Sequence, residues 1–423
     1  MNRFLTFLRY LSYCFGSLAL TIGICFSLLI AVASIPKDRI EENIKKSAEY
    51  LYTTQQLDLP VRLTRDNFTD SIMLNIAYCI DEDTPVTSAL ENKLYMLKDP
   101  EEGHRSLHYL LNGGEKLYKW TYFRYWHGYL VVLRPLLTIF DYPTIRYVNY
   151  IMFSTILIWL LYLTKKRFST GTMWVLLLAM AYASAFFIPQ SIQYSTTFYI
   201  SILASILIIT TFSHIIKPLT LSCIFTAVGA LTSFSDFLVT PVVTLGFPLS
   251  FVLLSIQDRN IREQLKLVVM LSAAWSFGYV GMWATKWISG TLLLEHNIIT
   301  DALNQLATRS IGTFPFNYRM TCSRIFWFLP DYGKLWWACI FLATLLTLTS
   351  MLYGLYRYNR KSFLQHITLL FVAMIPVLWS VMAFNHTMIH LFYVNRMYSV
   401  SIFTLGMFAI KILTDKKSAK VIN

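Results

Sequence analysis

The stretch YLSYCFGSLALTIGICFSLLIAVASIP, residues 10–36, contains no charged side chain. About 20 consecutive apolar residues are enough to cross the roughly 30 Å hydrocarbon core of a bilayer, and this stretch exceeds that length. It is also about twice as long as the apolar core of a signal peptide, and no small-residue cleavage site leads into a soluble domain. We therefore predict a retained transmembrane helix over residues 13–34.

The rest of the chain has the composition of the same class of protein. Hydrophobic residues make up 56% of the sequence and charged residues 14%, whereas soluble domains average about 25% charged residues. The expected fold class is therefore all-α, a polytopic membrane helix bundle of about ten transmembrane helices with two large outer loops. Nine further apolar windows predict helices over residues 147–164, 172–188, 196–213, 219–235, 238–256, 267–285, 336–355, 363–384 and 397–413.

Charge is distributed unevenly between the segments that separate these helices. The short connections and the two tails contain 16 Lys and Arg residues and 3 acidic residues, whereas the remainder contains 20 of each. Cytoplasmic loops carry an excess of Lys and Arg, so both termini are predicted to be cytoplasmic. The net charge of +13 then reflects topology, and nucleic acid is not an expected partner. The predicted organisation is a first transmembrane helix (1–34), a first outer loop (35–146), helices two to seven (147–285), a second outer loop (286–335) and three last helices with a cytoplasmic tail (336–423).

Both outer loops contain patterns that predict amphipathic helices on the membrane surface. In the first loop the pattern covers SIPKDRIEENIKKSAEYLYTTQQ, and in the second it covers TDALNQLATRSIG. The second helix could close over a substrate like a lid or simply rest on the membrane. Cys79 and Cys322 lie in the two outer loops and could form a bridge between them, whereas the other four cysteines fall in predicted spans.

Two carboxylates stand out in the first outer loop, within RLTRDNFTDSIMLNIAYCIDEDTP, residues 62–85. Apolar residues recur at helical spacing from Phe68 to Ile80, so Asp66 and Asp70 fall at the start of a helix and on one face. One interpretation is capping, with Asn67 as the N-cap and an acid in the first turn. The other is catalysis, in which one carboxylate acts as a general base toward a substrate hydroxyl.

A sugar carried on a polyprenyl phosphate would suit a base at the membrane surface. Its lipid tail stays in the bilayer, while its phosphate and sugar emerge at the outer face. Attack by an acceptor hydroxyl expels the polyprenyl phosphate, so the site also needs cations, and Arg binds phosphate bidentately. The candidates for substrate or phosphate binding are Arg124, Trp126, His127, Arg134, Asp236, Arg319, Arg324, His386 and Arg396.

Each of these candidates has a structural alternative. The aromatic residues near Arg124 suit interface anchors, and most loop cations simply face water or lipid headgroups. Arg134 lies inside the apolar run YLVVLRPLLTIF and must find a partner. Asp236 is the only carboxylate at predicted membrane depth, and it either serves function or caps the next helix.

The sequence defines no metal site. His104/His108 and His386/His390 have the i, i+4 spacing of metal ligands on a helix, but no third ligand can be named for either pair. No metal site and no certain cofactor are therefore predicted. A divalent cation is kept as an alternative.

The layout resembles the GT-C superfamily, which consists of integral membrane glycosyltransferases that use lipid-linked sugar donors. The shared features are a first span, a large outer loop with an early acid, many further spans and a second large outer loop. In that superfamily an early acid is often followed by an aromatic residue and another acid, and DNFTDSIML (Asp66, Phe68, Asp70) is similar. The resemblance implies that Asp66 or Asp70 is the base and that the other positions the acceptor or a metal.

The expected function is transfer of a sugar from a polyprenyl-phosphate donor to a glycan or lipid-linked acceptor. Enzymes that decorate bacterial O-antigens or cell-wall polymers are the closer analogy in size, and the expected location is the bacterial inner membrane. The alternatives are a lipid-linked glycan flippase or transporter, and a membrane glycan polymerase or acyltransferase. A transporter would show repeated halves and broken helices at the midplane, and neither is visible in the sequence.

Overall fold

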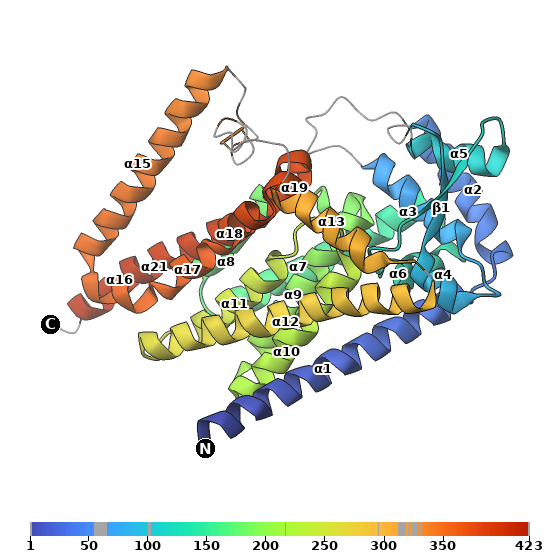
Figure 1. The fold of residues 1–423 in the computed structure, drawn as a ribbon. Helices are drawn as coiled ribbons and strands as arrows, with labels where there is room; N and C mark the ends of the chain where they lie inside the picture. The colour runs from blue at the N-terminus through green and yellow to red at the C-terminus, as the bar shows by residue number, and fades with distance from the viewer. Residues whose placement is uncertain are drawn as a thin grey trace.

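The computed structural model describes most of the chain, and its regular structure is almost entirely α-helical (Figure 1). The described residues are 2–54, 66–99, 103–215, 217–294, 296–311, 319, 322, 323, 326, 329 and 332–421.

Seven helices of the described chain are long and apolar enough to cross a membrane. Two consecutive segments pass the same test only as a pair bent by 49°, and two further apolar helices are shorter. The seven are α1 (Asn2–Ala33), α7 (Tyr142–Arg167), α9 (Ile192–Ile215), α10 (Pro218–Ser235), α12 (Ile261–Leu293), α15 (Lys334–Tyr358), and the 3-10 helix η3 (Asn395–Tyr398) with α21 (Ser399–Val421). The bent pair is α16 (Arg360–His366) with α17 (Thr368–Ala373) and α18 (Ile375–Met382), and the shorter helices are α8 (Thr170–Tyr182) and α11 (Val243–Ser255).

Every predicted transmembrane range overlaps one of these helices or the bent pair. The prediction of an all-α membrane bundle is confirmed at that level, while the number of ten crossings stays a prediction. Several boundaries were wrong. The first helix begins at Asn2 and not at residue 13, and α8 ends at Tyr182 and not at residue 188. The helix predicted from residue 147 begins at Tyr142, because Asp141 caps it and Pro143 occupies its first turn, and the helix predicted to end at residue 285 continues to Leu293.

Short elements fill the segments between the spans. Lys93 pairs with Thr121 and Met96 with Tyr118 in an antiparallel two-stranded sheet, which the all-α prediction did not include. The predicted amphipathic segments form α2 and α13. The short elements are α2 (Asp38–Thr53), α3 (Asn67–Cys79), α4 (Pro85–Glu91), β1 (Lys93–Met96), α5 (Gly103–Asn112), β2 (Tyr118–Thr121), α6 (Leu130–Leu137), η2 (Ile188–Gln190), α13 (Ile298–Ile311), α19 (Phe384–Ile389) and α20 (Leu391–Val394).

The two long loop segments meet at one end of the bundle, and the chain termini lie at the other (Figure 1). Arg124 of the first segment pairs with Asp301 of α13 at 3.0 Å. At the opposite end, Ser362 of α16 donates to Asp415 near the C-terminus at 2.5 Å. Cys79 and Cys322 are both free thiols, so the structure contains no bridge between the loops.

Two buried cations fasten the first long segment to the bundle. The Arg134 guanidinium is fully buried and donates to the backbone carbonyls of Val32, Ile35 and Ala77, which joins α6, α1 and α3. Lys286 of α12 is also fully buried, and it donates to the carbonyl of Leu90 at 2.8 Å. A buried charge needs such partners because an unpaired one is costly in a low-dielectric interior. These bonds therefore fix the first long segment on the apolar helices.

The helices α10 and α12 approach each other closely at two glycines. A Cβ atom added at Gly229 would overlap the backbone carbonyl of Trp275, and one added at Gly278 would overlap that of Thr226. Backbone atoms cannot rotate away as a flexible side chain can, so only glycine permits this approach of the two helices.

We expect Gly229→Ala to destabilise the protein by about 1–3 kcal/mol, the usual range for overpacking. Gly16→Ala in α1 is the control, since nothing lies within 4 Å of that added Cβ. Thermal unfolding of the detergent-solubilised variants, followed by tryptophan fluorescence, measures the difference. Equal melting temperatures for the two variants would contradict the close packing.

Candidate functional site

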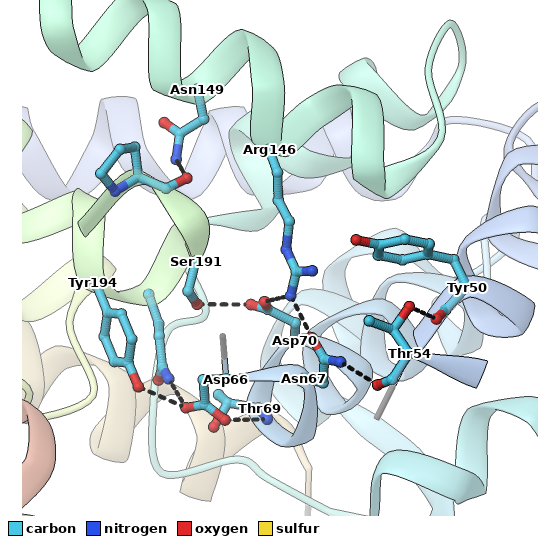
Figure 2. A network of polar contacts seen from close by, with 12 residues as sticks. Tyr50, Thr54, Asp66, Asn67, Thr69, Asp70, Arg146, Asn149, Ser191 and Tyr194 are labelled. Carbon is cyan, nitrogen blue, oxygen red and sulfur yellow. Dashed lines mark hydrogen bonds and ion pairs between the residues drawn. The ribbon is translucent and has the colours of Figure 1, made fainter. Parts of the chain in front are cut away.

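Asp66 and Asp70 lie at the start of α3 and face the beginnings of α7 and α9 (Figure 2). They occupy the end of the bundle where the two long segments meet. Their side chains come from one helical turn, but their surroundings differ.

Asp70 is fully buried in an ion pair. Its Oδ2 accepts from Arg146 Nη2 at 2.6 Å, and its Oδ1 accepts from the Ser191 hydroxyl at 2.7 Å. The same Arg146 nitrogen also donates to Asn67 Oδ1 at 2.8 Å. Burial raises the pKa of the Asp70 carboxyl, and the Arg146 charge works in the opposite direction. Both Asp70 oxygens are thus held in place by α7 and by the residue that precedes α9.

Asp66 is slightly exposed, at 8%, and caps α3. Its Oδ1 accepts from the Thr69 backbone N–H at 3.0 Å, so the N-cap is Asp66, one residue earlier than the predicted Asn67. Its Oδ2 accepts from the Gln193 amide and from the Tyr194 hydroxyl, the latter at 3.1 Å. Side chains from α9 therefore orient the Asp66 carboxylate.

An aromatic ring separates Asp66 from a cation. The Arg396 guanidinium is 4.5 Å from the centroid of the Tyr194 ring, whose hydroxyl bonds to Asp66, and it interacts electrostatically with that carboxylate. The Tyr393 ring lies 5.9 Å from Tyr194, and His390 stacks on Tyr393 at 5.3 Å. The chain of rings leads from the carboxylates toward α19.

His386 of α19 connects α13 to the hairpin between α10 and α11. Its Nδ1 accepts from Arg309 at 2.9 Å, and its Nε2–H donates to the Leu238 carbonyl at 2.9 Å. Burial lowers the pKa of His386 to about 3, so the imidazole is neutral and a single tautomer satisfies both bonds. Arg309 is thereby held beside the same chain of aromatic rings.

Asp236 follows the last residue of α10 and belongs to this hairpin. Its Oδ1 accepts from the Val239 N–H at 3.0 Å, whereas its Oδ2 is buried and has no hydrogen-bond partner among the described residues. Burial raises the pKa of Asp236 to about 7, although hydrogen bonds from the backbone oppose that shift. The carboxyl is thus a buried acceptor that titrates near neutrality.

The stability of the protein should depend on the protonation of Asp236. The folded pKa is raised, so this stabilisation is complete below the unfolded pKa near 4 and is lost as the pH rises through about 7. Between about pH 6 and about pH 8 the wild type should lose about 1 kcal/mol relative to Asp236→Asn, which keeps the shape without the charge. Melting curves of both proteins at the two pH values measure this. Parallel pH profiles would show that Asp236 does not titrate in this range.

Two non-glycine residues with positive φ lie beside Asp236. His127 has φ 56° and Leu238 has φ 66°, and the His127 ring lies 5.1 Å from Phe237. Such backbone conformations cost about 1–3 kcal/mol each and persist only where the surroundings impose them. Here the His386 bond to Leu238 and the Gly128 N–H bond to Phe234, at 2.9 Å, impose them.

Several predicted site residues make contacts that connect elements of the fold. The Trp126 indole donates to the Met282 carbonyl at 2.8 Å, and Arg134 donates to three carbonyls as described above. His127 is neutral because burial lowers its pKa to about 3, and its Nε2 lies 2.9 Å from the Tyr122 carbonyl oxygen. These three side chains and Arg124, which pairs with Asp301, connect elements and do not contact the carboxylates.

The two remaining predicted residues lie in the second long segment. Arg319 is half-buried, and Arg324 lies outside the described residues. Within the described part of the chain, no three His, Cys, Asp or Glu side chains gather as a metal-binding group.

Sequence reasoning missed the residues that organise the two carboxylates. Arg146 was placed at the end of a loop, yet it is an ionised residue at the start of an apolar helix, which is itself a functional signal. Gln193 and Tyr194 belong to the polar run SIQYSTT at the outer end of a predicted span. So many polar side chains beside an apolar helix are a second signal of a polar site. Comparisons of the chain with protein-family models, with curated proteins and with solved structures give no match.

Proposed function

We propose that the protein is a membrane glycosyltransferase of the GT-C type, with Asp66 as its general base. It transfers a sugar from a polyprenyl-phosphate donor to a hydroxyl of a glycan or lipid-linked acceptor, on the outer face of a bacterial inner membrane. The observation that carries the proposal is the setting of Asp66. Its carboxylate is oriented by Gln193 and Tyr194 and stands one ring away from Arg396.

The reaction needs a proton acceptor and a cation at different points of the substrate. Asp66 takes the proton of the acceptor hydroxyl as that oxygen forms a bond to C1 of the sugar. The bond between C1 and the phosphate oxygen breaks, and the electron pair leaves with polyprenyl phosphate. The leaving group gains negative charge, and in the proposal Arg396 and Arg309 bind it. Asp66 then releases its proton to water.

Asp70 has a different part in the proposed reaction. It is fully buried and ion-paired with Arg146, so a substrate hydroxyl has less access to it than to Asp66, which is 8% exposed. It positions α3 against α7 and α9 and thereby sets the direction of the Asp66 side chain. Asp236 and His386 belong to the neighbouring cluster of buried residues, and in the proposal the buried Asp236 Oδ2, which has no hydrogen-bond partner among the described residues, accepts from a sugar hydroxyl.

A transporter of lipid-linked glycans remains the second candidate, because one observation favours it. The α16–α18 segment is bent by 49°, and α8 and α11 are shorter than a full span. Broken and short helices are typical of transporters, which bind substrate near the bilayer midplane. The Asp66 site lies instead at the end of the bundle, among the long segments, which supports the enzyme.

A transfer assay distinguishes these candidates. Purified protein in liposomes is incubated with a panel of polyprenyl-phosphate hexoses, each radiolabelled in the sugar, and with bacterial lipid-linked glycans as acceptors. The enzyme should move label from the donor into a glycan that survives mild acid, with release of unlabelled polyprenyl phosphate. Label that stays on the donor but changes leaflet would support the transporter and would reject transfer.

A further inference from the structure

A groove lies far from the proposed site, at the end of the bundle that holds the termini. It runs between α1, α10 and α12 and has a volume of about 1150 Å³. Most of its wall is apolar and includes Leu11, Met270 and Phe277. Such a wall suits a hydrocarbon chain, since it offers dispersion contacts and few hydrogen-bonding groups.

Two cations stand among the lining residues of this groove. Arg259 precedes α12 and pairs with Glu263 at a long 4.0 Å, with both side chains substantially exposed. Lys266, one turn further along α12, is exposed and forms no ion pair with any described residue. Two cations and one acid give the charged part of the groove a net positive charge.

We infer that this groove binds an anionic phospholipid of the leaflet on the side of the termini. An acyl chain lies against the apolar wall, and the phosphate and headgroup meet Lys266 and Arg259. A neutral lipid would gain the apolar contacts but not the charge pairing, whereas anionic headgroups are attracted by basic residues near the membrane surface. The inference uses no residue of the glycosyltransferase proposal and does not depend on it.

Photolabelling of the full-length protein tests the assignment. The protein is placed in phosphatidylcholine nanodiscs that contain a minority of phosphatidylglycerol with a photoreactive acyl chain, and labelled peptides are mapped. Labels should concentrate on the peptides of α1 and α12 that line the groove. Lys266→Ala should reduce this labelling about fivefold, as expected for one cation near the surface.

Matched controls separate the groove from general attraction to a basic surface. Arg262 is an exposed cation on α12 that does not line the groove, so Arg262→Ala should leave the labelling unchanged. Ala273→Trp should fill the groove and suppress labelling without a change of charge, whereas Ser276→Trp, one turn away on the exposed surface, should not.

Three results would overturn the inference. The first is equal loss of labelling in Lys266→Ala and Arg262→Ala, which would indicate non-specific attraction. The second is equal labelling by a photoreactive phosphatidylcholine, which would show that the headgroup is not recognised. The third is labelling that Ala273→Trp does not reduce, which would place the lipid outside the groove.

Discussion

Asp66→Asn should lower the rate of sugar transfer by about 10²–10⁴-fold, the usual contribution of a general base. The amide of asparagine cannot accept the proton of the acceptor hydroxyl. The substitution preserves folding, because asparagine is as good an N-cap as aspartate and can still accept from the Thr69 N–H. The radiolabelled transfer assay measures the rate, and thermal unfolding confirms the fold.

Asp141→Asn is the matched control for Asp66→Asn. Asp141 also caps a helix at the same end of the bundle, and its carboxylate accepts from the Thr144 N–H at 3.0 Å. It is partly exposed and is not part of the proposed site. Transfer should therefore persist in Asp141→Asn. Full activity in Asp66→Asn would eliminate Asp66 as the base, whereas equal loss in both variants would point to damage at helix caps.

Arg146→Gln should destabilise the protein by about 3–5 kcal/mol, because it leaves the Asp70 carboxylate buried without its counter-charge. The pair is almost fully buried, with Arg146 side-chain exposure of 5% and Asp70 exposure of 0%. Denaturant titration of the purified protein in mixed micelles measures the free energy of unfolding. Asp70→Asn should also destabilise, since it leaves the Arg146 charge unpaired.

Two further variants test whether the loss comes from the pair. The double variant Asp70→Asn/Arg146→Gln contains no unpaired charge and should recover part of the lost stability, so that the two substitutions are not additive. Arg124→Gln breaks a more exposed pair with Asp301 and should cost about 1 kcal/mol or less. Additive losses in the double variant would show that Asp70 and Arg146 act independently.

The fold was largely predictable, because the bilayer demands long apolar helices and leaves few alternatives. The ten predicted ranges all overlap apolar helical segments, and the predicted amphipathic segments form α2 and α13. The strands β1 and β2 were missed because each has only four residues. Four residues are too few to show the alternation of apolar and polar side chains that identifies a strand.

The candidate site was predicted only in part. Asp66 and Asp70 were identified because their spacing is local, within one turn of one helix. Their partners Arg146, Ser191 and Gln193 are 76 to 127 positions further along the chain, and no periodicity relates them to α3. Arg134 was placed among the candidates because a charge inside an apolar run needs a partner, and Trp126 because a Trp beside a cation is typical of carbohydrate binding. The sequence does not say that each side chain donates to a backbone carbonyl.

The sequence by itself determined the class of protein, the helical ranges and the segregation of basic residues to the connections beside the termini. These properties follow from the composition and from the local periodicity of apolar residues. Each residue contributes to them independently of residues far away in the sequence. Only the tertiary structure decided that Asp70 is locked in a buried ion pair while Asp66 remains slightly exposed near Arg396. The physical reason is that burial and charge pairing depend on which helices pack together, and two acids one turn apart acquire different environments only after α7 and α9 have closed around them.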